Sequence, residues 1–153
     1  MNPFRFCYLP ILLFAAFPAF ANVTVSFPSP TYTDIGPPGH ERDDVKNELA
    51  RHIQALEAKY GSPSDNLWIE VVDVDLAGNR SGGRHDVRVT RGNSDFPQIV
   101  VRYKLDRGGQ LKTGEDTLRD VSYSFSMTKK GSSEPLYYEK QLLENWFKDR
   151  FAQ

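Results

Sequence analysis

The chain has 153 residues, with 19 basic and 20 acidic side chains and a formal net charge of −1. This balance predicts neither nucleic-acid binding nor a highly charged tail. The length suffices for one domain with an ordinary hydrophobic core.

Residues 1–21 have the pattern of a secretory signal peptide. Arg5 places a positive charge near the start, an apolar run with prolines extends from Leu9 to Phe20, and the letters AFA form a small-x-small cleavage site. The run is too short and too rich in proline for a membrane anchor. We expect cleavage after Ala21, no transmembrane segment in the mature chain, and a periplasmic or secreted location.

Cys7 is the sole cysteine and lies inside this leader. The mature chain is therefore expected to have no disulfide, no cysteine nucleophile and no cysteine-ligated zinc. Without such cross-links it must fold around a hydrophobic core, and residues 22–153 are predicted to form a single domain.

A strand and a helix are predicted first. Val23–Phe27 alternates apolar and polar residues, as a half-buried strand does. A proline-rich connection follows and is expected to cross an edge of the fold. From about Glu41 to Tyr60, apolar residues at spacings of three and four predict a helix, which Gly61 and Pro63 end.

The next segment, Leu67 to Leu76, predicts a strand that is apolar on both faces at its start. Such a pattern is typical of a central strand, and we expect both helices to pack on it. Strict alternation assigns its residues to two faces: Trp68, Glu70, Val72, Val74 and Leu76 on one, and Leu67, Ile69, Val71, Asp73 and Asp75 on the other.

The second half contains a predicted hairpin and a closing helix. Ile99–Leu105 and Gln110–Leu118 flank a turn with two glycines, which predicts a hairpin. His85–Thr90 and the alternating Val121–Met127 are candidates for further strands, and whether Ser122–Met127 joins the sheet stays open. A helix is expected from about Pro135 to Phe151.

This order of elements predicts an α+β fold. Short turns between neighbouring strands favour a mostly antiparallel sheet of about five strands, with two helices packed on one face. No internal repeat or long linker divides the mature chain.

Three motifs carry a family resemblance: DVDLAG (Asp73–Gly78), DVRVTRGNSDFP (Asp86–Pro97) and YYEKQLLENWF (Tyr137–Phe147). In this order, after a signal peptide, they resemble the exported bacterial family of domain of unknown function 3016. The resemblance covers nearly the whole mature chain and implies a periplasmic or surface location in a Gram-negative bacterium. It implies no reaction, cofactor or partner.

Asp73 and Asp75 begin a pattern similar to that of a calcium-binding loop. The EF-hand is excluded, because its fifth and twelfth positions hold Ala77 and Arg84 instead of oxygen ligands. A looser divalent metal site formed by Asp73, Asp75 and Asp86 remains open. Alternatively, the aspartates end a strand and fix the following turn by hydrogen bonds to the backbone.

A cluster of cationic side chains follows within twelve residues: Arg80, Arg84, His85, Arg88 and Arg91. Guanidinium groups bind phosphate and carboxylate in a bidentate manner, so this loop is a candidate site for a phosphorylated glycolipid, an anionic polysaccharide or a nucleotide. The alternative is a solvated charged surface without a ligand.

No HExxH, GxSxG, P-loop or dinucleotide motif occurs in the sequence, and no cofactor is predicted. The first hypothesis is therefore a non-enzymatic module of the cell envelope that binds an envelope protein or an anionic small molecule or glycolipid through Asp73–Arg91. The alternative is a metal-assisted envelope hydrolase that uses Asp73, Asp75, His85 and Asp86. The motifs favour the first, because an enzyme should show a positioned nucleophile, base or metal set.

Overall fold

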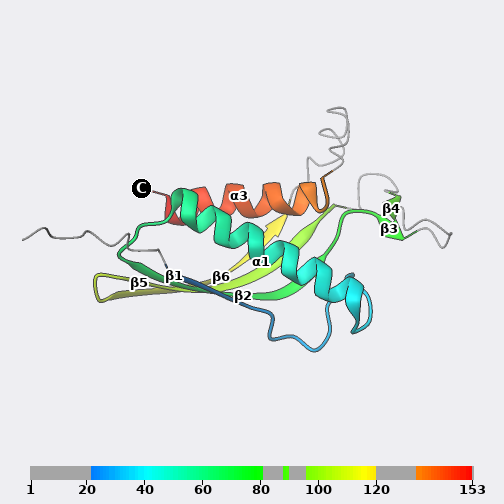
Figure 1. Cartoon of the computed structure of the whole chain (residues 1–153), viewed down its shortest axis with the longest axis horizontal. Helices are drawn as coiled ribbons and strands as arrows, with labels where there is room; N and C mark the ends of the chain where they lie inside the picture. The colour runs from blue at the N-terminus through cyan, green and yellow to red at the C-terminus, as the bar shows by residue number, and fades with distance from the viewer. Residues whose placement is uncertain (1–21, 81–87, 90–95, 120–133, 153) are drawn as a thin grey trace, which may run out of the picture.

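Two helices lie side by side on one face of a four-stranded sheet in the computed structural model (Figure 1). The structure describes residues 22–80, 88–89, 96–119 and 134–152. The elements in chain order are β1 Asn22–Ser26, α1 His40–Tyr60, β2 Asp65–Asp75, β3 Asn79–Arg80, β4 Arg88–Val89, β5 Gln98–Arg107, β6 Gln110–Arg119 and α3 Tyr137–Phe151. The predicted α+β class is confirmed.

The main sheet has the strand order β1-β2-β5-β6. β1 and β2 are parallel because α1 connects them as a crossover, whereas β2 with β5 and β5 with β6 are antiparallel. Within the described residues the sheet thus has four strands, where about five were expected. Of the candidate strand at His85–Thr90 the structure describes Arg88–Val89, which is β4 and pairs with β3 in a separate ribbon. Val121–Met127 lies outside the described residues.

The predicted hairpin is confirmed, and its turn explains its regular register. Gly108 and Gly109 have φ angles of 60° and 84°, the left-handed values that a two-residue type I′ turn requires. β5 and β6 then pair from Arg107↔Gln110 to Gln98↔Arg119 without an irregularity. This continuous register gives the sheet a long outer strand without a bulge.

The hydrophobic core lies between the helices and the sheet. α1 contributes a stripe of buried residues that includes Leu49 and Ile53, and α3 contributes Leu143 and Phe147. Complete burial of an aliphatic or aromatic side chain stabilises a fold by roughly 1.5–3 kcal/mol. The core therefore joins both helices to the sheet, and buried residues of β2 and β5 belong to the same cluster.

A β-bulge in β2 changes which residues of that strand are buried. The register with β5 shifts between Val71 and Asp73, so that Val72 is the additional residue. Val74 and Leu76 are consequently buried on the helix side of the sheet together with Val71. Strict alternation had placed them on the opposite face with Trp68, and that prediction is wrong.

The connection between β1 and α1 covers the part of β2 that the short strand β1 leaves unpaired. The backbone N–H of Asp34 donates to the carbonyl of Val74 at 3.1 Å. The buried guanidinium of Arg42 holds the same connection against α1, donating to the carbonyls of Pro30 and Gly36. The proline-rich connection thus crosses an edge of the sheet, as expected.

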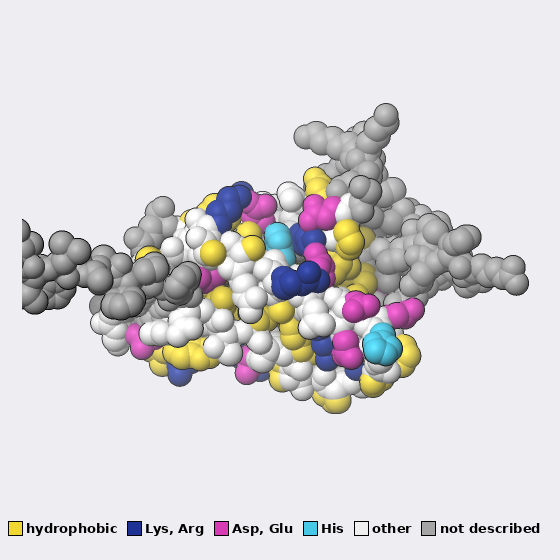
Figure 2. All heavy atoms as spheres, viewed as in Figure 1, with side chains coloured by type: hydrophobic (Ala, Val, Ile, Leu, Met, Phe, Trp, Pro, Cys, Tyr) yellow, Lys and Arg dark blue, Asp and Glu magenta, His cyan; other side chains and the backbone are white. Residues whose placement is uncertain are grey.

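The outer surface of the helices carries charges of both signs (Figure 2). Acidic side chains gather near the beginning of α1, where Glu41 and Asp43 lie in its first turn. α3 begins at Tyr137, two residues after the predicted start, because Leu136 has a left-handed backbone with φ 56°. No helix in the described part of the chain is long and apolar enough to cross a membrane.

Candidate functional site

Asp73, the first candidate metal ligand, is engaged in a structural contact. Its carboxylate accepts a hydrogen bond from the backbone N–H of Thr33 at 2.8 Å and another from the Thr33 hydroxyl at 2.6 Å. The two bonds fix the connection between β1 and α1 to the end of β2. The role is structural, but the partner is Thr33, forty positions earlier in the chain, and not the turn after the strand that the sequence offered as the alternative to metal binding.

The remaining candidate metal ligands are not brought together among the described residues. Asp75 lies at the end of β2 opposite Gln98, and Asp86 and His85 lie outside the described residues. Within the described ranges, no group of three or more histidine, cysteine, aspartate or glutamate residues is arranged to hold a metal ion. The divalent site therefore stays a prediction.

Two of the five cationic candidates occur in the β3–β4 ribbon. The antiparallel register places Arg80 directly opposite Arg88 and Asn79 opposite Val89. Two like charges at directly opposite positions of a ladder generally destabilise it. The other candidates of this cluster, Arg84, His85 and Arg91, lie outside the described residues.

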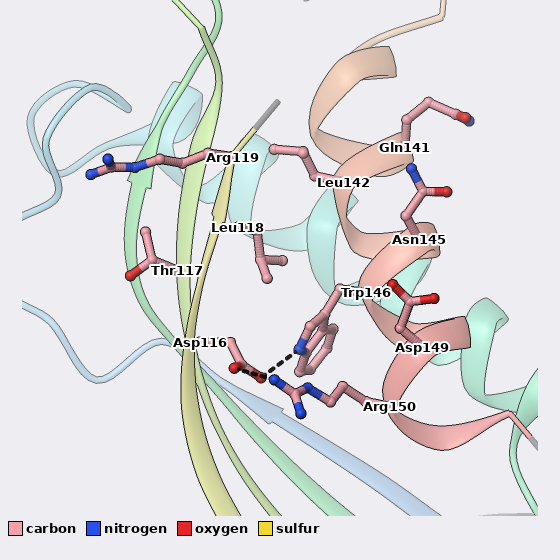
Figure 3. Close-up of a pocket in the computed structure, with 10 residues that line it drawn as sticks. All are labelled: Asp116, Thr117, Leu118, Arg119, Gln141, Leu142, Asn145, Trp146, Asp149 and Arg150. Atoms are coloured by element: carbon pink, nitrogen blue, oxygen red, sulfur yellow. Dashed lines mark hydrogen bonds and ion pairs between the residues drawn. The ribbon is translucent and has the colours of Figure 1, made fainter. Parts of the chain in front are cut away.

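A groove with a volume of about 500 Å³ lies between α3 and the outer strand β6 (Figure 3). Its floor is apolar, because Leu118 of β6 and Leu142 of α3 point toward each other beside the indole of Trp146. All three side chains are largely buried and belong to the hydrophobic core. The floor of the groove is thus the edge of the hydrophobic core.

One end of the groove is closed by polar contacts between β6 and α3. The Asp116 carboxylate accepts a hydrogen bond from the indole Nε1 of Trp146 at 2.9 Å and forms an ion pair of 2.7 Å with Arg150 (Figure 3). Both carboxylate oxygens are therefore occupied. The contact joins α3 to β6 at this end of the groove.

The α3 rim of the groove carries polar side chains with unused hydrogen-bonding capacity. Gln141, Asn145 and Asp149 follow each other at intervals of four residues and therefore line up along one side of the helix. All three are exposed, and none bonds to another described residue. Such a row can donate to and accept from a bound molecule.

A second cluster of ionisable groups joins α1 to α3. The buried ammonium of Lys140 contacts Glu48 at 2.6 Å and Glu134 at 2.8 Å, and its backbone carbonyl lies 3.0 Å from the ring nitrogen of His52. Burial lowers the pKa of His52. Burial alone would also lower the pKa of Lys140, but the hydrogen bonds to the two glutamates outweigh it and raise that pKa. The cluster holds the helices together.

A buried acidic pair lies where α1 ends and β2 begins. Burial, together with the negative charge of Asp65, raises the pKa of Glu57. Asp65 is itself buried and forms an ion pair of 2.7 Å with Arg107, although its Oδ1 atom has no hydrogen-bond partner. Both residues are buried, and neither lines the groove.

The open face of the sheet carries a shallow hollow of about 370 Å³. Lys104 lies over the Trp68 ring, with its Nζ atom 4.9 Å from the ring centre, and Arg102 forms ion pairs with Glu70 and Glu115. These cross-strand contacts stabilise an exposed sheet face. The polar groups here are thus already paired with one another.

No motif in the sequence predicts the groove. The apolar residues of α3 predict a helix, and the polar row on its other side matches no known binding pattern. The spacing of Gln141, Asn145 and Asp149 is a signal in the sequence, but polar and charged residues on the exposed side of a helix usually serve only solubility.

Comparison with known proteins gives one result. The family model described as "Protein of unknown function (DUF3016)" matches residues 21–149. Neither the curated proteins nor the solved structures give a match. The match covers more than four-fifths of the chain and includes every described element up to the last turn of α3, which confirms the resemblance carried by the three motifs. The chain therefore belongs to the DUF3016 family.

Proposed function

We propose that this protein is an exported, non-enzymatic module of the cell envelope that binds an anionic ligand at the β3–β4 ribbon. The observation that carries the proposal is the pairing of Arg80 with Arg88 in the ribbon register. Like charges at opposite register positions weaken a two-stranded ribbon, and a bound phosphate or carboxylate offsets them, because guanidinium groups bind such anions with paired hydrogen bonds.

The surrounding sequence supports an anionic ligand with several charged groups. Arg84, His85 and Arg91 belong to the same stretch and add up to three further cations. A phosphorylated glycolipid of the envelope has the matching chemistry, since its phosphates present several charges at fixed spacing.

A non-enzymatic role is favoured over the hydrolase alternative by the contacts of Asp73. The hydrolase would use Asp73, Asp75, His85 and Asp86 to hold a metal. Both oxygens of Asp73 are bonded to Thr33, so metal binding would have to break the contact that fixes the β1–α1 connection.

Export is supported by the leader pattern of residues 1–21 and by the start of the family match at residue 21. The test is mass spectrometry of the protein purified from its own envelope. A chain that begins at Asn22 is expected, and a chain that still carries residues 1–21 would contradict cleavage after Ala21.

The ligand is tested by native mass spectrometry of the same preparation and by titration with lipid A that carries two phosphates, one phosphate or none. We expect affinity to fall as phosphates are removed. Replacement of both ribbon arginines, Arg80→Gln with Arg88→Gln, should weaken binding about tenfold or more, which corresponds to the loss of charge-assisted hydrogen bonds.

The matched control is Arg51→Gln with Lys112→Gln, which removes the same charge from exposed sites on α1 and β6. This control should leave binding within about twofold of the original. Equal losses in both double variants would contradict a specific site and indicate attraction by overall charge alone.

A further inference from the structure

The two edges of the main sheet differ. On one side, the connection between β1 and α1 continues along β2 after β1 ends, with the N–H of Asp34 bonded to Val74. On the other side, β6 extends over Gln110–Arg119 with no proline and no bulge. Among the described residues, no strand pairs with its outer side. Folded proteins usually protect so long and regular an edge.

The hairpin turn determines which backbone groups β6 presents outward. Arg107 and Gln110 flank the two-residue turn and form a hydrogen-bonded pair. Hydrogen-bonded pairs alternate along an antiparallel ladder, so the even-numbered residues of β6 bond to β5. The N–H and C=O groups of the odd-numbered residues, Glu115, Thr117 and Arg119 among them, therefore point away from the sheet.

The groove lies directly beside this outward-facing backbone (Figure 3). α3 forms its opposite side, and the apolar floor of Leu118, Leu142 and Trp146 lies between. A strand added to β6 would present every second side chain to that floor, since side chains alternate between the faces of a sheet. The groove and the edge thus form a single surface suited to an extended chain.

We propose that β6 binds an extended peptide segment of another protein as an added strand, in the groove between Glu115–Arg119 and α3. The backbone of the peptide pairs with the outward groups of β6. An apolar side chain of the peptide covers Leu118 and Leu142. This site is separate from the anion site of the β3–β4 ribbon and does not depend on it.

The rim of α3 specifies the chemistry of the peptide. Gln141 and Asn145 each offer both donors and acceptors, which suits peptide groups and polar side chains. Asp149 is exposed and carries a charge that no described cation neutralises, whereas the neighbouring Asp116 is paired with Arg150. A lysine or arginine at the end of the peptide that lies against Asp149 is therefore favoured.

This arrangement corresponds to a general mode of peptide recognition. In strand addition, main-chain hydrogen bonds supply affinity, and the pockets for alternate side chains supply specificity. A compact small molecule would leave most of the outward backbone groups of β6 unused, so the open edge favours a peptide over such a ligand.

The test begins with selection of displayed random peptides of about seven residues, the length of one strand, on the purified protein. We expect enrichment of sequences that combine alternating apolar residues with a basic residue. The best peptide, added to the protein, should slow hydrogen exchange at the amides of Glu115, Thr117 and Arg119.

Two proline substitutions on the same edge distinguish a loss of hydrogen bonds to the peptide from a general destabilisation of the strand. Thr117→Pro removes an outward N–H inside the groove, and Leu111→Pro removes an equivalent N–H near the hairpin, outside it. Proline is tolerated at such edge positions because the lost donor faces solvent. Thr117→Pro should weaken peptide binding about tenfold or more, whereas Leu111→Pro should leave it within about twofold.

A third variant keeps the test decisive if Thr117→Pro fails to fold. Asp149→Asn lies on the exposed side of α3 and should weaken basic peptides about three- to tenfold. The proposal is overturned if no peptide is enriched or if Thr117→Pro and Asp149→Asn both bind normally. It is also overturned if the free protein already shows slow exchange at Thr117, either as a monomer or through concentration-dependent pairing of two copies.

Discussion

Glu144 connects the two helices at the end of α1, and its replacement by glutamine tests whether charge or packing holds them together. Its carboxylate accepts a hydrogen bond from the Tyr60 hydroxyl at 2.6 Å and contacts the ammonium groups of Lys148 at 3.0 Å and Lys59 at 3.2 Å. The hydrogen bonds from Tyr60 and Lys148 are the largest causes that lower the pKa of Glu144 to about 2.

The size of the effect follows from this pKa. A fall from the ordinary value of 4.5 to about 2 corresponds to roughly 3 kcal/mol of stabilisation of the folded state. Solvent screens part of it, because the side chains of Lys59 and Lys148 are 62% and 44% exposed. We therefore expect Glu144→Gln to lower the free energy of unfolding by about 1–2 kcal/mol at neutral pH.

The sign of the pH dependence is fixed by the direction of the pKa change. Because folding lowers the pKa of Glu144, its contribution is complete above the ordinary value of 4.5 and is lost as the pH falls toward about 2. The difference between the original protein and Glu144→Gln should therefore be largest at neutral pH and shrink through this acidic range.

Urea unfolding at a series of pH values measures this difference. The control is Glu115→Gln, an exposed partner of Arg102 on the open sheet face, which should change stability by less than about 1 kcal/mol. A loss in Glu144→Gln that is the same at neutral and at strongly acidic pH would refute the electrostatic explanation and assign the effect to packing.

Three further substitutions test the core, the hairpin and the contact between Asp73 and Thr33. Phe147→Ala should lower the free energy of unfolding by about 3–5 kcal/mol in urea titrations, since the side chain is fully buried. Gly114→Ala should lower the free energy of unfolding by about 1–3 kcal/mol, because its methyl group would lie 2.7 Å from the Tyr103 ring. In the same titrations, the double variant with Tyr103→Leu should lose less than the sum of the two single losses. Asp73→Ala should cost about 1 kcal/mol through the lost bonds to Thr33, equally with calcium and with a chelator in thermal unfolding; a loss seen only with calcium would support the metal hypothesis.

The helices and the hairpin could be predicted because their signals are local. The apolar spacing over Glu41–Tyr60 and the glycine at position 61 gave a helix within one residue of the observed α1. The hairpin followed from Gly108 and Gly109, since only a few residue types adopt two successive left-handed conformations. Such signals involve few residues and do not depend on the tertiary structure.

The bulge and the groove depend on contacts between distant segments, and local patterns do not contain them. Val72 looks like an ordinary strand residue, and the register shift after it becomes evident only from the pairing with β5. The role of Asp73 likewise depends on Thr33, forty positions away in the chain. The motif-like spacing of Asp73 and Asp75 predicts a metal site, whereas the hydrogen bonds between Asp73 and Thr33 become evident only from the tertiary structure.

α3 contributes to both the core and the groove. Substitutions on its buried side and on its exposed side should therefore affect stability and the proposed peptide binding separately. Trp146 and Leu142 pack inward against β5 and β6, so substitutions there alter the fold together with the groove floor. Asn145 and Asp149 are exposed and bond to no other described residue, so substitutions there remove no core contact. The groove thus combines a packed floor with rim side chains whose hydrogen-bonding groups have no described partner. Such an arrangement favours specific binding, because a packed floor loses little conformational entropy when a ligand binds.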